Sequence, residues 1–206
     1  DTGEHAHLVW LHGIARTFPA LGDAAGWSVQ FGRELNATED RASFGAEGLP
    51  VIEGKHVMPF EVDQAAAVQR IKRSRAIELL PDGRFTHPRL AYRDVSGAPN
   101  RRALIAAVVP ADVITTHTLF CLRTPLELLR QQFLCGLFNS STLDAIVRML
   151  MGGHVTTSLV EALPVPIWTG EPDQIAIASL AEQLRDEAGN VDALAELNAR
   201  VAELYH

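Results

Sequence analysis

A change in residue pattern at Pro125 constrains the fold more than any other feature of this sequence. Before it, short runs rich in β-branched and aromatic residues alternate with Gly, Pro and acidic turns, which is typical of strands and loops. After it, apolar residues recur at helical spacing in segments 125–138, 141–151, 173–187 and 191–205. The sequence therefore predicts an α+β fold, with a lead-in over residues 1–26, a β-rich part over 27–124 and a helical part over 125–206.

Within the β-rich part, the stretch "PRLAYRDV" has the alternation of a strand. Leu90, Tyr92 and Asp94 should lie on one face, and Arg89 and Arg93 on the other, so that a single face presents two arginines. Two further strands are expected in 103–110 and 112–122. A short helix is expected over 64–71, because Asp63 is a good N-cap for the Ala- and Gln-rich turn that follows.

Composition and cysteine usage exclude several classes of protein. The chain is 47% hydrophobic, enough for a folded core, yet no apolar run reaches the length of a membrane span and no signal-peptide pattern opens the sequence. Cys121 and Cys135 have apolar neighbours, so we expect free thiols and a reducing cytoplasm. The chain begins at Asp1 rather than Met, so we expect a fragment of a longer protein.

Charge is distributed unevenly along the chain. The net charge is −7, but residues 70–123 hold ten basic and four acidic groups, a net +6. Nine of those ten cations are arginines, whose planar fork suits phosphate oxygens and guanine edges. The acidic terminal helices favour contact with another protein. An anionic partner for the basic segment is therefore the leading hypothesis, and a protein-interaction domain acting through its helices is an alternative.

The stretch "LPVIEGKHVMPFEV" allows a catalytic alternative. Glu53 and Lys55 form half of the pattern of a Mg²⁺-dependent nuclease, in which Asp40 would supply a second carboxylate and the metal would activate a water. The Glu-x-Lys tripeptide is common by chance, and Gly54 weakens the strand that such a site needs. Otherwise the sequence has no nucleophile elbow, phosphate-binding glycine loop, dinucleotide motif or zinc-ligand spacing.

Four stretches together resemble a known family. They are "FGRELNATEDRASF", "LPVIEGKHVMPFEV", "PRLAYRDVSGAPNRRALIAAVVP" and "LFNSSTLDAIVRMLMGGHVTTSLVEALPVP". They are similar to the C-terminal TaqI-like target-recognition domain of bacterial adenine-specific DNA methyltransferases, found also in type IIG restriction-modification enzymes and related to type I specificity subunits. The most specific parts are Glu-Gly-Lys-x-Val-x-x-Phe and the tail in which a helix beginning at Asn-Ser precedes Leu-Pro-x-Pro.

The resemblance implies sequence-specific recognition of double-stranded DNA beside a separate methyltransferase domain. That domain would bind S-adenosylmethionine and methylate a flipped adenine. Its Asn/Asp-Pro-Pro-Tyr/Phe motif has no match here, so we expect this chain to hold no cofactor or metal and to have no catalytic residue.

The residues expected to meet DNA combine the charge pattern with this resemblance. For phosphates the sequence favours Lys55, His56, Arg70, Lys72, Arg73 and Arg75. For base edges it favours Arg89, Arg93, Asn100, Arg101 and Arg102. Arg33, Asn36 and Arg41 match the resemblance too, but the sequence leaves open whether they contact DNA or brace their loop.

Overall fold

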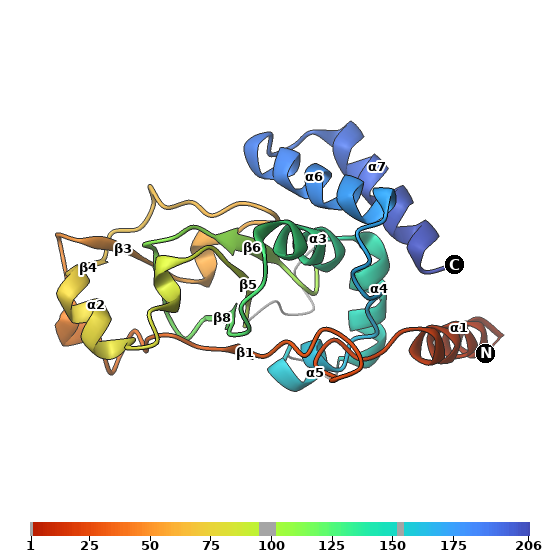
Figure 1. Ribbon diagram of the computed structural model, residues 1–206, viewed down its shortest axis with the longest axis horizontal. Coiled ribbons are helices and arrows are strands. Elements are labelled where there is room, and N and C mark those ends of the chain that lie inside the picture. Colours follow the sequence, from red (N-terminus) through yellow and green to blue (C-terminus); the bar gives the residue numbers. More distant parts are fainter. Residues whose placement is uncertain (1, 95–101, 152–154) are drawn as a thin grey trace.

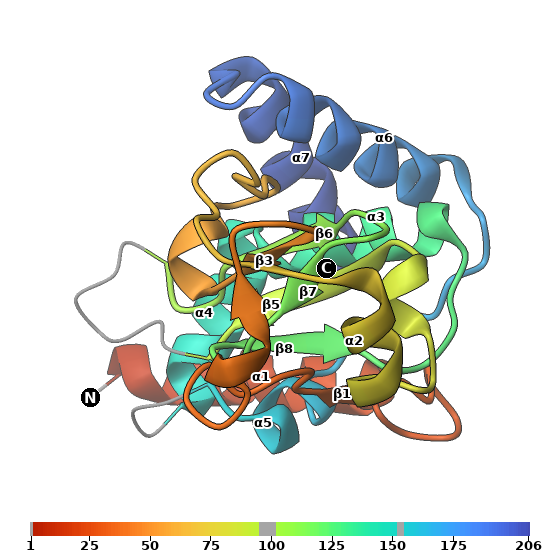
Figure 2. The same ribbon diagram turned by 90° about the vertical axis from the view of Figure 1, so that its left-hand side faces the viewer.

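Two small sheets are formed by residues 31–122, and helices from the C-terminal part of the chain cover one side of the first sheet (Figure 1). The computed structural model describes residues 2–94, 102–151 and 155–206, and confirms the α+β class with C-terminal helices. The second sheet lies toward one end of the long axis, and the last two helices lie toward the other. Figure 2 looks onto the end that carries the second sheet and α2.

The first sheet is antiparallel and has the strand order β1-β8-β5-β6. Its strands are β1 (Phe31–Gly32), β8 (Leu119–Leu122), β5 (Arg89–Arg93) and β6 (Ala106–Val109). The strand predicted around Leu90 is confirmed as β5, whose Ala91 pairs with Ala107 on one side and Cys121 on the other. β5 is thus an inner strand with neighbours on both edges.

The second sheet has the order β2-β4-β3-β7, with β3 and β7 parallel and the other pairs antiparallel. Its strands are β2 (Phe44–Gly45), β4 (Arg70–Ile71), β3 (Leu49–Ile52) and β7 (Ile114–Thr115). Three 3-10 turns accompany the sheets: η1 (Arg41–Ser43), η2 (Gly54–His56) and η3 (Arg84–Thr86). Helix α2 (Arg73–Leu79) follows β4 directly.

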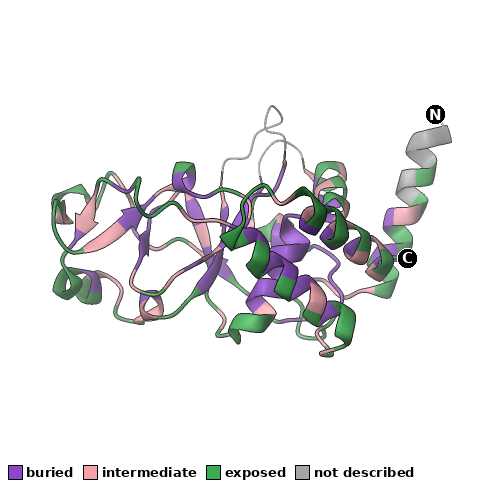
Figure 3. Cartoon of the chain, turned by 90° about the horizontal axis from the view of Figure 1, so that it is seen from above, coloured by how far each residue is buried: buried purple, intermediate pink, exposed green. Residues whose placement is uncertain are grey.

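The alternation of β5 assigns its two faces to two different cores. Leu90 and Tyr92 point toward the helices, and the Tyr92 ring lies edge-on to Phe31 and Phe138 at 5.1 and 6.3 Å between centroids. Ala91 and Cys121 point toward Ile52 and the second sheet. The first sheet is therefore a central layer. Figure 3 shows the buried residues concentrated between this sheet and the helices.

The helical part contains α3 (Leu128–Phe138), α4 (Ser141–Leu150), α5 (Thr157–Glu161), α6 (Pro172–Asp186) and α7 (Val191–Leu204). α3 lies on the first sheet, and its Asn139 cap closes the β6 edge by accepting the Ala106 N–H and donating to its carbonyl, at 3.1 and 2.8 Å. The next residue, Ser140, caps α4 through the Leu143 N–H. The helix predicted to begin at Asn-Ser is confirmed.

The Leu-Pro-x-Pro segment is held by the N-terminal part of the chain. The Leu21 N–H donates to the Leu163 carbonyl at 2.8 Å, and Trp27 Nε1 donates to the Pro166 carbonyl at 3.0 Å. The Tyr205 hydroxyl adds a bond to the Pro164 carbonyl at 2.9 Å. Residues from both ends of the chain therefore bind the Leu-Pro-x-Pro segment. Helix α1 (Thr2–Thr17) precedes the N-terminal residues that do so.

The helix predicted over residues 64–71 is wrong. Asp63 Oδ1 does accept the Ala66 N–H at 3.0 Å, but only a turn follows, and Ile71 enters strand β4. The alanine-rich segment buries only Ala67 in that turn, and so short a helix lacks the packing it needs. The helix forms instead at α2, where Ala76 packs against Ile71 and Phe85.

Both cysteines are free and buried, as expected, and burial raises the pKa of each thiol to about 12. Within the described ranges, no helix has both the length and the apolar character needed to cross a membrane.

Close packing of α3 on α6 gives a first prediction. A Cβ on Gly136 would lie 2.7 Å from Ile177 Cγ2, a branched side chain that has no free end to move away. We expect Gly136→Ala to lower the free energy of unfolding by about 1–3 kcal/mol, measured by urea denaturation. Gly13→Ala is the control, because no atom lies within 4 Å of its Cβ position. If Gly136→Ala is as stable as that control, the packing is looser than described.

Candidate nucleic-acid interface

The basic residues expected to share one surface occupy separate places in the structure. Arg70, Lys72, Arg73 and Arg75 follow one another through β4 and the start of α2. Lys55 and Arg93 lie beside Gly54, Arg89 is inside the protein, and Arg102 lies next to the end of α3. Asn100 and Arg101 fall outside the described residues, so their role in base reading stays a prediction.

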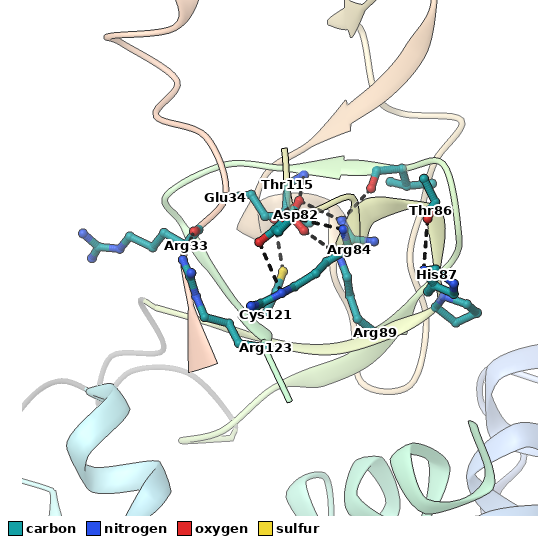
Figure 4. Close-up of polar contacts among 12 residues, drawn as sticks. Arg33, Glu34, Asp82, Arg84, Thr86, His87, Arg89, Thr115, Cys121 and Arg123 are labelled. Atoms are coloured by element: carbon teal, nitrogen blue, oxygen red, sulfur yellow. Dashed lines mark hydrogen bonds and ion pairs between the residues drawn. The ribbon is translucent and has the colours of Figure 1, made fainter. Parts of the chain in front are cut away.

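Arg89 is a structural residue, which corrects its expected role in base reading. It is 3% exposed, and its guanidinium forms a two-pronged pair with Glu34, with Nε–Oε1 at 2.5 Å and Nη2–Oε2 at 2.7 Å (Figure 4). The same carboxylate accepts the Thr115 N–H and hydroxyl at 2.8 and 2.9 Å. Burial lowers the pKa of Arg89, but Glu34 and Cys121 together raise it, and the net shift is upward, so the charge is retained. Arg89 and Arg93 do lie on the same face of β5, as predicted, but the second sheet covers that face.

His56 also has an internal role, because Glu53 and His56 cap the η2 turn for each other. The Glu53 N–H donates to His56 Nδ1 at 3.0 Å, and the Glu53 carboxylate accepts the His56 N–H. His56 is 8% exposed, and burial, followed by the charge of Lys55, lowers its pKa. The sequence predicted that His56 contacts a phosphate, and its burial and internal bonds correct that prediction. Lys55 remains exposed, with Nζ 2.8 Å from Glu53 Oε2.

The same contacts explain the Glu-x-Lys tripeptide without catalysis. The Glu53 carboxylate is engaged by Lys55 and by the backbone of η2, and Asp40 Oδ2 accepts the Asn36 N–H at 2.7 Å. In the part of the chain that the structure describes, no group of three or more His, Cys, Asp or Glu is placed to hold a metal ion. Each carboxylate of the nuclease hypothesis thus stabilises its own loop.

The segment from β4 into α2 carries the exposed cations of the second sheet; we call Arg70, Lys72, Arg73 and Arg75 the β4–α2 surface. Arg70 and Lys72 flank the fully buried Ile71, so both point outward. Arg70 Nη1 donates to the Gly48 carbonyl at 3.2 Å, and Lys72 lines a hollow of about 580 Å³ together with Arg75 and loop 42–47. Neither Arg70 nor Lys72 has a carboxylate partner among the described residues.

Arg73 and Arg75 are paired, but only at the surface. Arg73 Nη1 lies 2.8 Å from Asp112 Oδ1, and Arg75 Nη1 lies 2.7 Å from Glu78 Oε2. About half of each arginine side chain is exposed. Exposed ion pairs contribute little free energy and exchange readily for another anion. Both guanidiniums therefore remain available to a phosphate.

Arg93 and Arg102 are half-buried. Arg93 Nε has no hydrogen-bond partner in the structure and lies 3.7 Å from the position of a Cβ on Gly54. Arg102 Nη1 donates to the Asn139 carbonyl at the end of α3. Their side chains thus lie away from the β4–α2 surface.

Of the three residues left open by the sequence, Asn36 and Arg33 have internal partners, and a DNA contact by Arg41 stays a prediction. Asn36 braces its loop, since its Oδ1 accepts the N–H groups of Thr38 and Glu39 at 2.9 and 3.3 Å. Arg33 pairs with Asp94 at 2.8 Å and lies over the Phe120 ring, 4.8 Å from its centroid. Arg41 is exposed and has no ion pair among the described residues.

The ion pairs distinguish the two parts of the chain. Every arginine of the helical part has a carboxylate within 4.0 Å: the pairs are Arg130–Glu127, Arg148–Asp144, Arg185–Asp186 and Arg200–Asp173. Among the described residues, carboxylate-free cations of the β-rich part are Arg41, Arg70, Lys72, Arg93 and Arg123. Of these, sequence reasoning missed Arg123 as a DNA-contact candidate and left Arg41 open, because only the three-dimensional arrangement shows which cations lack a carboxylate.

Comparison with known proteins finds similar chains among solved structures only. No protein family matches the chain, and no curated protein sequence does. Among solved structures, the chain is similar to one from work on the structural basis of complex assembly and conformational transition of the type I R-M system. The identity is 16% and the TM-score 0.46, over 98% of this chain and 50% of the other. This chain thus spans about half of that chain's length.

The buried pair gives a second prediction. Glu34→Ala leaves the Arg89 charge buried without its partner, and we expect the free energy of unfolding to fall by about 3–5 kcal/mol in urea denaturation. Glu78→Ala, which removes the exposed partner of Arg75, is the control and should change stability by less than about 1 kcal/mol. Equal effects from the two substitutions would contradict the structural role of Glu34.

His56 gives a third prediction, on pH. Its pKa in the folded protein lies below the ordinary value of 6.5, so below pH 6.5 the unfolded chain binds the proton more readily. The stability that the neutral imidazole contributes is complete above 6.5 and declines as the pH falls toward the folded pKa. We expect His56→Asn to flatten the dependence of unfolding free energy on pH between about 7 and 5.5. The matched control is His87→Asn at an exposed site, and an unchanged slope in His56→Asn would refute the assignment.

Proposed function

We propose that this chain is a DNA target-recognition domain that binds double-stranded DNA sequence-specifically. Its parent would be a bacterial adenine-specific DNA methyltransferase or a type IIG restriction-modification enzyme of the cytoplasm. The methyltransferase domain and its S-adenosylmethionine would belong to the rest of that parent. The observation that carries the proposal is the placement of exposed, carboxylate-free cations on the β-rich part, while every helical arginine is paired.

The chemistry of the β4–α2 surface supports a polyanion as the ligand. Lys72 and Arg70 carry charges that no described carboxylate neutralises, and the pairs of Arg73 and Arg75 are exposed enough to exchange. Phosphate contacts of this kind set the register of a protein on a duplex. The net charge of −7 does not oppose this, because the negative excess belongs to the helical part, which carries eleven acidic residues and four basic ones.

The family resemblance described above implies that the polyanion is double-stranded DNA. The Glu-Gly-Lys-x-Val-x-x-Phe stretch places exposed Lys55 on η2, within the β-rich part that would face DNA. Base reading would fall to Arg93, Asn100, Arg101 and Arg102, and Lys55 would contact phosphate. A role for α6 and α7 in packing against the methyltransferase domain follows from their acidic outer residues.

The fourth prediction concerns DNA affinity. Selection from a randomised duplex pool should enrich one motif, and affinity for that duplex should fall about 10³-fold between about 50 and 200 mM salt if some six phosphates are contacted. Replacing Arg70 and Lys72 together by Ala should weaken binding for all sequences alike and lower the salt slope by about 2. Arg185→Ala on α6 is the control and should bind as the native chain does.

Three outcomes would contradict the proposal. Failure of the pool to enrich any motif would remove sequence recognition, and salt-independent binding would remove the phosphate contacts. Cleavage of plasmid DNA by the purified chain in Mg²⁺, abolished by Glu53→Ala, would establish the nuclease alternative instead.

A further inference from the structure

A cleft beyond the far end of α2 gathers three arginines from different parts of the chain. It consists of two adjoining hollows of about 260 and 600 Å³, both lined by Asp82, Arg84, Leu122 and Arg123. The smaller hollow also reaches Arg33 and the end of α2 at Leu79. Figure 4 shows Arg123 and Arg84 next to each other in this region, with the Arg33 side chain extending outward from it. We call it the Arg84–Arg123 cleft.

Arg123 is held in place without a carboxylate. Its Nη2 donates to the Arg33 carbonyl at 2.7 Å, and its guanidinium lies directly against the backbone of Gly32, where any Cβ would collide with Nε. It is exposed, and no ion pair to it occurs among the described residues. The positive charge is therefore fixed in position before any ligand arrives, which lowers the entropic cost of binding.

Arg84 brings an unsatisfied donor to the same cleft. Its Nε lies 3.2 Å from Asp82 Oδ2, but its Nη1 is buried and has no hydrogen-bond partner among the residues that the structure describes. A guanidinium N–H that is shielded from water and unpaired is costly, so such a group is normally satisfied by an acceptor. A ligand oxygen in the cleft would supply that acceptor.

The carboxylates that line the cleft do not neutralise it. Glu34 already accepts bonds from Arg89 and Thr115, and Asp82 is the partner of Arg84. Arg33 is paired with Asp94 at the rim, with 48% of its side chain exposed. Glu127, at the outer edge of the larger hollow, is 81% exposed, and Arg130 Nε lies 3.9 Å from its Oε2. Arg123 is left as the excess charge.

We propose that the Arg84–Arg123 cleft binds a phosphate group of the DNA backbone, in addition to the contacts of the β4–α2 surface. This inference rests on the proposed function. Paired guanidiniums suit phosphate because each presents two parallel N–H donors to two oxygens. The seven residues of α2 span only about 10 Å between the two places, which is short beside the roughly 34 Å of one duplex turn. One duplex can therefore contact both.

The fifth prediction tests this cleft in the full chain. Arg123→Gln and Arg84→Gln keep a polar, hydrogen-bonding side chain but remove the charge. Each should weaken binding to the enriched duplex about 5- to 30-fold and lower the salt slope by about 1, without changing the enriched motif. Arg200→Gln is the matched control, because Arg200 is a helical arginine whose partners Asp173 and Glu196 do not line the cleft. Urea midpoints measured alongside identify any variant that is merely unfolded, and Arg123→Lys then tests the charge in a folded protein.

The possible outcomes separate the cleft from the proposed function. If the native chain binds DNA and both Gln variants match Arg200→Gln, the cleft assignment fails while DNA recognition stands. If the native chain binds no duplex, both fail together. A changed motif with an unchanged salt slope would mean that the arginines read bases, and would overturn the phosphate assignment. Calorimetric binding of inorganic phosphate that depends on Arg123, with duplex affinity unaffected by its loss, would assign the cleft to a free anion and overturn the DNA contact.

Discussion

The buried carboxylate of Glu34 connects the two sheets, and the arrangement of the β-rich part depends on it. It receives Arg89 from β5 of the first sheet and Thr115 from β7 of the second, through four bonds of 2.5 to 2.9 Å. An apolar replacement of similar volume can match a buried ion pair in stability, but it has no directional bonds. Those bonds fix how the second sheet, and with it β4 and α2, is oriented against β1 and β8. Together with the apolar core between the sheets, this pair therefore contributes to where the cationic groups lie relative to one another.

The sequence predicted local structure well wherever a pattern is complete within one element. The alternation of β5 and the helical spacing after Pro125 are both confirmed, because each records which side chains of one element are buried together. It did not show that both faces of β5 are covered, since the second sheet that covers Arg89 comes from other parts of the chain. The helix predicted after Asp63 failed for a related reason: a good cap does not replace a packed apolar face, and that face occurs at Ala76 in α2.

The candidate site was predicted only in part, because charge along a sequence does not show which charges are neutralised in the fold. The Arg89–Glu34 pair joins residues 55 positions apart, and the Arg33–Asp94 pair joins residues 61 apart. No sequence pattern singled out Arg123 as a candidate, since its position depends on a contact with the backbone of Gly32 on another strand. The capping of η2 by Glu53 and His56 is local, yet a glutamate and a histidine in those positions also fit a catalytic pattern, and only the hydrogen bonds decide between the two readings.

The opposite ends of the long axis differ in electrical character. Acidic residues outnumber basic ones eleven to four in the C-terminal part that includes α6 and α7, whereas the carboxylate-free cations lie among the strands at the other side of the molecule (Figure 1). The protein consequently has a permanent dipole, and the field of a nearby polyanion exerts a torque on it. This torque rotates the protein so that its strand end faces the polyanion before contact. The rotation occurs although the net negative charge of the protein is repelled.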